Sequence, residues 1–158
     1  MYFRDIIGQD SAIQVLCSAV AEGRIPHAQL ICGSEGVGKL ALAIAYARYL
    51  CCTHRSGHDA CGECPSCKKF DKLVHPDLHF AFPIYKKDSS KTPHSDDFID
   101  KWRQAVAENP YMNLNQWMDH IGIENQQGLI YASQSEEIIR KLTLKSSEGG
   151  YKVMIIWM

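Results

Sequence analysis

The sequence contains no long hydrophobic run, no excess of either charge, and no internal repeat or low-complexity tract. A membrane-spanning helix needs roughly 20 consecutive apolar residues, and no segment approaches that length. The first ten residues, MYFRDIIGQD, also lack the basic start and the apolar stretch of a secretory signal. We therefore expect a cytoplasmic protein that has no membrane partner.

The balance of charge argues against one class of function. Lys and Arg total 17 while Asp and Glu total 18, which gives a formal net charge of -1. A surface that binds DNA without sequence preference generally shows a basic excess. With 158 residues, of which 46% are hydrophobic and 22% charged, the chain has the size and composition of one ordinary globular domain.

Hydrophobic periodicity predicts the structure around a glycine-rich segment. Apolar residues recur with helical spacing over 10–20, and the apolar run 28–32 has the length of a buried strand. The segment GSEGVGK follows, and after it comes LALAIAYARYLCC, which has strong helix formers and neither Gly nor Pro. We therefore predict a strand, a loop and a helix over 28–52.

Further elements are predicted in the second half of the chain. The helix that begins near Ser133 should turn Ile138, Ile139 and Leu142 inward. The last predicted strand has a strong buried signal, and the chain stops on it, so we interpret the sequence as the N-terminal part of a longer protein. The predicted elements are helices at 68–74, 98–109, 114–122 and 133–144, a polar loop at 86–97, and strands at 78–82 and 151–157.

Residues 33–39 match the G-x-x-x-x-G-K part of a Walker A phosphate-binding loop. Glycines allow successive backbone N–H groups to turn toward phosphate oxygens, and the helix N-terminus and Lys39 add positive charge. The alternative is a chance glycine-rich turn, which the predicted strand–loop–helix context disfavours. The candidate nucleotide-binding residues are Gly33, Ser34, Glu35, Gly36, Val37, Gly38, Lys39 and Leu40.

Leu40 departs from the Walker A pattern. A Ser or Thr is expected there, because its hydroxyl binds Mg²⁺. Leucine offers no oxygen, and Mg²⁺ is central to neutralising charge during phosphoryl transfer. We therefore expect hydrolysis to be badly impaired, whereas ATP binding through the loop amides and Lys39 stays open.

The cysteines form a second motif. The spacing Cys52-x8-Cys61-x2-Cys64-x2-Cys67 supplies four thiolates, the closed tetrahedral set of a structural zinc site. An iron–sulfur cluster of bacterial type would need a Cys-Pro just downstream, which is absent, and metal-free thiols are the third alternative. The sequence alone specifies three ligands, so other residues could replace Cys52 as the fourth, namely Cys51, His54, His58 and His75.

Together these features resemble the delta-prime subunits of the clamp loader of bacterial DNA polymerase III, which belong to the AAA+ family. The matching features are the opening Phe3-x2-Ile6-Ile7-Gly8-Gln9, the segment Arg24-x2-His27-Ala28-x-Leu30 before the loop, the loop itself, the cysteine module and His75-Pro76-Asp77. The resemblance implies an α/β P-loop NTPase fold of AAA+ type, with a three-layer core around a parallel sheet. It also implies a zinc knuckle at about 52–67, and a mainly helical insertion at about 83–128 that exceeds what the family usually places there.

The resemblance also implies a function. Such a subunit assembles with the gamma/tau and delta subunits to load the sliding clamp on primed DNA during replication, and does not itself hydrolyse ATP. Gamma/tau subunits keep a Thr after the loop lysine, so Leu40 favours the delta-prime type. Walker B acids and an arginine finger would lie beyond Met158, and no catalytic residue is assigned. The alternatives are an active gamma/tau-like ATPase and a zinc-dependent nucleic-acid-binding module, which the near-neutral charge disfavours.

Overall fold

The structure, a computed structural model, describes residues 1–86, 93–123 and 127–158. It divides the chain into two compact units, Met1–His75 and Pro76–Met158. Half of the predicted polar loop at 86–97 falls on residues 87–92, which lie outside the described residues. Within the described part, no helix combines the length and apolar character that a bilayer crossing requires.

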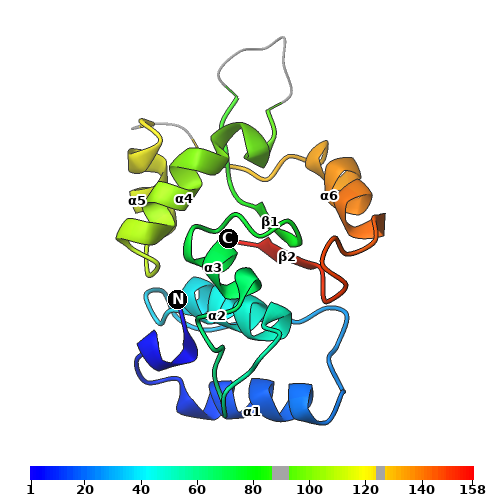
Figure 1. Ribbon diagram of the computed structural model, residues 1–158. Helices are drawn as coiled ribbons and strands as arrows, with labels where there is room; N and C mark the ends of the chain where they lie inside the picture. The colour runs from blue at the N-terminus through cyan, green and yellow to red at the C-terminus, as the bar shows by residue number, and fades with distance from the viewer. Residues whose placement is uncertain (87–92, 124–126) are drawn as a thin grey trace. The chain divides into compact units, whose positions relative to one another are not determined.

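The first unit is built from helices (Figure 1). Both long helices predicted for it are confirmed. The short helix at its end starts three residues before the predicted position, because the Cys64 side chain caps it by accepting the N–H of Cys67 and Pro65 occupies its first turn. The elements are η1 (Phe3–Asp5), α1 (Asp10–Ala21), α2 (Lys39–Cys51) and α3 (Pro65–Asp71).

The strand predicted at 28–32 was wrong. The structure describes this segment in full, and it forms no ladder with any described strand. The side chain of Leu30 is 89% exposed. A strand exists only where a neighbouring strand accepts and donates its backbone hydrogen bonds, and apolar composition alone cannot supply that neighbour.

The second unit contains a parallel pair of strands, β1 (Leu78–Ala81) and β2 (Val153–Ile156), which lie side by side (Figure 1). Leu78 pairs with Val153 and Ala81 with Ile156. The pairing confirms both predicted strands and a mixed helix–strand fold with a small parallel sheet. The expectation that the last strand is buried was wrong for Ile156, which is 59% exposed.

The described part of the region 83–128 contains helices joined by irregular segments, and it contributes to the core of the second unit. Its elements are η2 (Ser95–Phe98), α4 (Ile99–Glu108) and α5 (Leu114–His120). The ring of Trp102 stacks on Phe82 at 4.2 Å, and Trp117 meets Trp102 edge-on at 5.1 Å. The indole N–H of Trp117 donates to the carbonyl of Pro83 at 2.7 Å. Burial of three large rings makes these helices a structural part of the unit.

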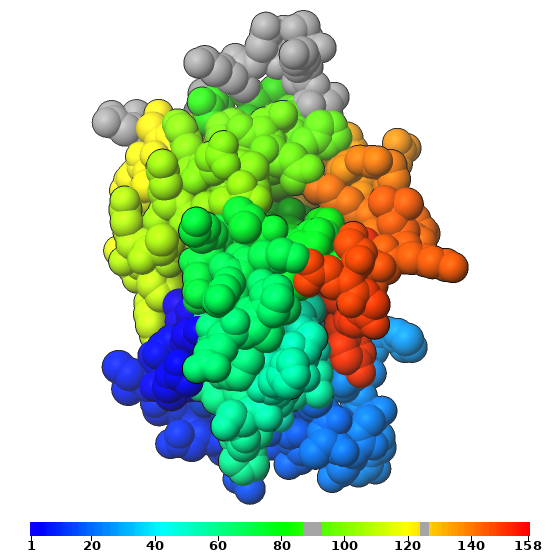
Figure 2. Space-filling view, viewed as in Figure 1, coloured from blue at the N-terminus to red at the C-terminus, as the bar shows by residue number. Residues whose placement is uncertain are grey.

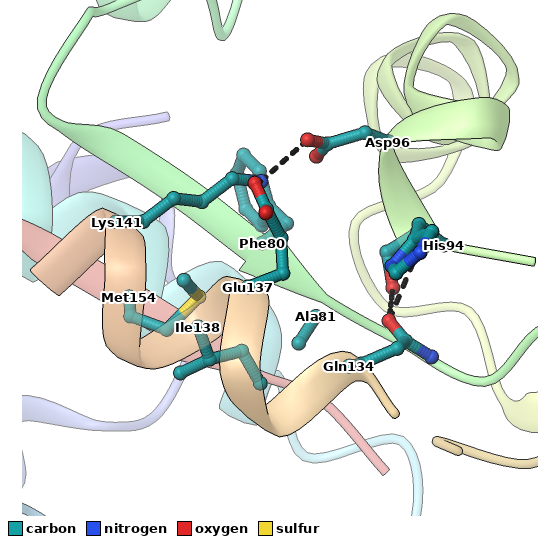
Figure 3. A pocket seen from close by; sticks show the side chains of 10 residues that line it. Phe80, Ala81, His94, Asp96, Gln134, Glu137, Ile138, Lys141 and Met154 are labelled. Carbon is teal, nitrogen blue, oxygen red and sulfur yellow. Dashed lines mark hydrogen bonds and ion pairs between the residues drawn. The ribbon is translucent and has the colours of Figure 1, made fainter. Parts of the chain in front are cut away.

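Helix α6 (Gln134–Thr143) forms as predicted but is rotated. Ile139 and Leu142, expected inside, are 61% and 46% exposed. The inward side carries Ile138, as predicted, together with Gln134, which accepts a hydrogen bond from Ser95 Oγ at 2.6 Å, and Lys141, which pairs with Asp96 at 2.5 Å (Figure 3). The polar contacts with η2 therefore decide the orientation of α6, and the helix and the turn after it lie open on the surface (Figure 2).

Asp77 joins the start of β1 to the turn that precedes β2. Its carboxylate accepts the N–H of Ser147 at 2.8 Å, the N–H of Glu148 at 3.1 Å and the hydroxyl of Ser146 at 2.9 Å. The ammonium of Lys152 lies 3.4 Å away, and the residue is 1% exposed. Burial raises the pKa of Asp77, but these donors and Lys152 outweigh it and hold the pKa below its ordinary value.

Replacing Asp77 by Asn should lower the free energy of unfolding of the second unit by about 2 kcal/mol at neutral pH, since a buried charged acceptor is lost. Urea unfolding followed by tryptophan fluorescence measures this, because Trp102, Trp117 and Trp157 all lie in that unit. The depressed pKa makes the contribution complete above the ordinary Asp pKa of about 3.9 and lost as the pH falls through the folded-state pKa. The difference between the two proteins should therefore shrink in acid.

The matched control is Asp100→Asn, whose side chain is 89% exposed. It should change the unfolding free energy by less than about 0.5 kcal/mol at any of these pH values. Equal losses for the two variants would mean that Asp77 does not anchor the turn.

Candidate functional site

The glycine-rich loop at 33–38 leads directly into α2. Gly36 has a φ of 77° and Gly38, the N-cap of α2, has a φ of 85°. Only glycine takes this left-handed conformation without steric cost. The two glycines inside the sequence pattern are therefore required by the backbone path, which brings the loop to the N-terminus of the helix.

The loop carries a cation at its open side. The Lys39 ammonium donates to the carbonyls of Gly33 at 2.9 Å and Ser34 at 2.6 Å. Residues 33–36 are exposed, while Val37 and Lys39 are half-buried. An exposed loop, a lysine and the positive end of a helix of 13 residues are the parts that bind phosphate oxygens.

Leu40 lies in a different environment from the rest of the motif. It is 4% exposed and belongs to the hydrophobic core. The position that would supply a hydroxyl to Mg²⁺ therefore serves packing. The structure brings together the backbone and the cation that a phosphate-binding loop would need, and Leu40 adds no metal ligand to them.

A residue outside the Walker motif also contacts the loop. Gln9, at the N-cap of α1, donates from Nε2 to the carbonyl of Val37 at 3.1 Å. The spacing of the loop motif gives no sign of this contact, because the two residues are far apart in the chain. Only the packing of α1 against α2 brings them together.

The four cysteines predicted as ligands converge. The sulfur atoms of Cys52, Cys61, Cys64 and Cys67 all lie within 4.8 Å of one another. The Cys52–Cys61 distance is 3.6 Å, and the Cys61–Cys67 and Cys52–Cys64 distances are 4.0 Å. Four sulfurs bound at about 2.3 Å to one tetrahedral zinc would be about 3.8 Å apart. The donor set and its spacing therefore fit a closed zinc site.

Backbone N–H groups point at the sulfurs. Cys61, Cys64 and Cys67 each donate an N–H at 3.4 Å to the sulfur of the preceding cysteine of the set. These bonds hold the cluster in shape and favour thiolates, which are the form that binds metal. Among the described residues, these four are the His, Cys, Asp and Glu side chains whose ligand atoms gather in one place. Cys51 lies outside the group.

The surroundings of the four thiols raise the pKa of two of them and lower the pKa of the other two. Burial raises the pKa of Cys67 and of Cys52, whereas the N–H of Cys64 is the main cause that lowers the pKa of Cys61. For Cys64, burial raises the pKa, but hydrogen bonds from Cys67 and Thr53 outweigh it and lower the pKa to about 6. Thr53 is a contact that the cysteine spacing does not predict.

A cavity in the second unit is not a nucleotide site. It measures about 10 Å³, which is room for one water molecule, and lies between β1, η2 and α6 (Figure 3). Gln134 is 3% exposed beside it, and its Nε2 has no hydrogen-bond partner. A single buried water would satisfy that group, so we treat the cavity as part of the packing of α6.

One family model and several subunits of DNA polymerase III are similar to this chain. The chain matches the family described as DNA polymerase III, delta subunit, over residues 8–158. The DNA polymerase III subunit tau/gamma of Haemophilus influenzae is 37% identical over 76 residues, which are 48% of this chain and 11% of that protein.

Two delta-prime subunits are also similar. That of Yersinia pestis is 34% identical over 99 residues, 63% of this chain and 26% of that protein. That of Bacillus subtilis is 33% identical over 75 residues, 48% of this chain and 22% of that protein. The matched part thus spans 11% to 26% of the length of these three relatives. Because the family match covers nearly every residue, the chain belongs to the DNA polymerase III delta subunit family.

Proposed function

We propose that this chain is part of a delta-prime-type clamp-loader subunit. It would assemble with gamma/tau and delta subunits to load the sliding clamp on primed DNA, in the cytoplasm, without hydrolysing ATP itself. The observation that carries the proposal is Leu40, which is buried in the core at the Mg²⁺-binding position of a loop that otherwise keeps its phosphate-binding parts. The family match supports the setting.

In this role the loop would act through binding alone. The loop N–H groups and Lys39 can hold a polyphosphate at the end of α2, and a bound nucleotide would stiffen the start of that helix. We therefore propose that residues 33–40 bind a nucleotide without hydrolysing it. The function would come from contacts with neighbouring subunits.

The four cysteines are proposed as a structural zinc site. Their sulfur distances support Cys52 as the fourth ligand, ahead of Cys51, His54, His58 and His75. A bound zinc ion would supply cross-links and no open coordination position. The cysteines would hold the segment between α2 and α3, which is irregular where it is described and contains one isolated bridge, Ser56 with Asp59.

A second candidate is an active ATPase subunit of gamma/tau type. The tau/gamma relative of Haemophilus influenzae is 37% identical, above the 33% and 34% of the two delta-prime relatives. The matched segments differ in length, so identity does not separate the two types. An active enzyme would need a metal ligand from elsewhere in place of Leu40.

Assembly is the direct test of the proposed function. The full-length protein mixed with purified gamma/tau and delta subunits should elute with them as one complex on size exclusion, and the complex should load a labelled clamp on primed DNA. The protein alone should show no ATP turnover above background. Failure to join the complex would overturn the proposal, and ordinary ATPase turnover by the protein alone would favour the second candidate.

Replacing Leu40 by Thr tests the role of the missing hydroxyl. The unchanged protein should bind labelled ATP weakly, or equally with and without Mg²⁺, whereas Leu40→Thr should gain Mg²⁺-dependent binding because the hydroxyl can reach the metal. Leu42→Thr is the matched control, since both leucines are 4% exposed on the same helix. Both variants should lose about 3 kcal/mol of stability. Tight Mg²⁺-dependent binding by the unchanged protein would contradict the prediction.

The purified protein should contain one equivalent of zinc, as measured by elemental analysis. Cys64→Ser should lose the metal, because serine cannot replace a thiolate in a closed sulfur site. Affinity should fall as the pH is lowered, since protons compete with zinc for the thiolates. Cys32→Ser, at an exposed cysteine outside the cluster, should keep its zinc. Iron in place of zinc, or a metal-free protein, would refute the assignment.

A further inference from the structure

Residues near the N-terminus contact the segment that contains the cysteine cluster. Asp59 accepts the N–H of Phe3 at 3.2 Å and the N–H of Arg4 at 3.2 Å, and its carboxylate lies 3.5 Å from the Arg4 guanidinium. Tyr2 packs against the cysteine cluster. Asp59 lies two residues before Cys61, so the chain links it directly to the cluster.

The same segment makes a second contact farther along the chain. The thiol of Cys17, on α1, donates to the carbonyl of His58 at 3.5 Å. His58 and Asp59 are adjacent in the chain. His58 contacts Cys17 on α1, while Asp59 contacts Phe3 and Arg4 near the N-terminus. In the sequence, Gln9 lies between these two contacts, after Arg4 and before Cys17.

Gln9 is the residue that reaches the phosphate loop, through its bond to the Val37 carbonyl at 3.1 Å. The loop itself is exposed and rich in glycine, and glycine loses more conformational freedom on ordering than any other residue. Within the loop, Lys39 bonds the first two carbonyls, while Gln9 bonds the carbonyl just before the N-cap of α2. Gln9 is therefore a contact from outside the loop that can order this last part.

We propose that the cysteine cluster orders the phosphate loop through His58 and Asp59, which hold Gln9 against Val37, so that the loop loses its ordered conformation when the metal is removed. The inference rests on zinc binding as proposed above. It goes beyond a purely architectural zinc, since it makes the metal state a control on the affinity of the loop for a polyphosphate. Gln9 and Asp59 are positioning residues in this arrangement.

Backbone ¹⁵N relaxation of the whole chain tests the proposal. In the zinc-loaded protein, residues 33–38 should show order parameters of about 0.85. Chelation of the metal under reducing conditions should lower these order parameters below about 0.6. Gln9→Met, which keeps the side-chain length but removes the donor, should lower them with zinc still bound and with residues 3–6 still ordered. This outcome would show that the contact between Gln9 and Val37 orders the loop, and that the effect is not a general loss of structure.

Asp59→Asn tests the first link with all four cysteines intact. It removes the charge and one acceptor oxygen, so residues 3–6 and 33–38 should both lose order while zinc content stays at one equivalent. Glu63→Gln is the matched control, because Glu63 is an exposed carboxylate in the same segment, and it should change neither region.

Two results with these variants would overturn the inference. One is a zinc-loaded Asp59→Asn protein whose loop keeps the order of the unchanged protein. The other is a Gln9→Met protein whose loop is equally unaffected. A metal-free preparation would instead overturn the zinc assignment, whereas a zinc-loaded protein whose loop stays ordered after chelation would overturn this inference alone, so the two failures can be told apart.

Discussion

The burial of helix α2 is the constraint on which the first unit depends. Every residue from Leu40 to Leu50 except Ala43 is buried, so the helix can neither rotate nor shift without opening the core. The glycine-rich loop enters it at Lys39, and the first cysteine of the cluster, Cys52, follows its last residue. One rigid element therefore sets the positions of both candidate sites.

The same burial explains why Arg48 is a structural residue. It is 0% exposed on α2, pairs with Asp71 at 2.6 Å and lies 4.1 Å above the ring of Tyr2. A buried guanidinium needs such partners, because its desolvation is costly. The pair ties α2 to α3, while Tyr2 brings the N-terminal segment to the same place. A leucine at position 40 packs into this core better than a residue with a hydroxyl group would, because nearly the whole helix is buried.

The second unit is organised differently, around a small sheet and an aromatic cluster. Trp102 and Trp117 come from the helices of the region 83–128, so this region supplies core to the unit as well as surface. Asp77 fixes the turn before β2, and polar contacts from η2 fix α6. Burial of large rings provides the stability, while a few buried polar groups choose the orientation of the elements.

Local patterns in the sequence were sufficient for much of the fold. The helices α1, α4 and α5 follow from apolar spacing and from the residues that end them, and α2 follows from its strong helix formers, because these are properties of a short window. The two strands of the sheet were also predicted. The strand at 28–32 and the inward placement of Ile139 and Leu142 on α6 were not predicted correctly, since each depends on a partner that no window contains: a neighbouring ladder for the first, and Ser95 and Asp96 for the second.

The candidate sites divide in the same way. The sequence by itself determined the glycines, Lys39 and Leu40 of the loop and the spacing of the four cysteines, because each motif is compact along the chain. Only the tertiary structure decided that Cys52, and not Cys51, joins the other sulfurs, since the end of α2 sets which of two adjacent side chains faces the cluster. It also decided that Gln9 bonds the loop and that Asp59 holds residues 3 and 4. These contacts join distant segments, and they exist because packing in three dimensions brings those segments together.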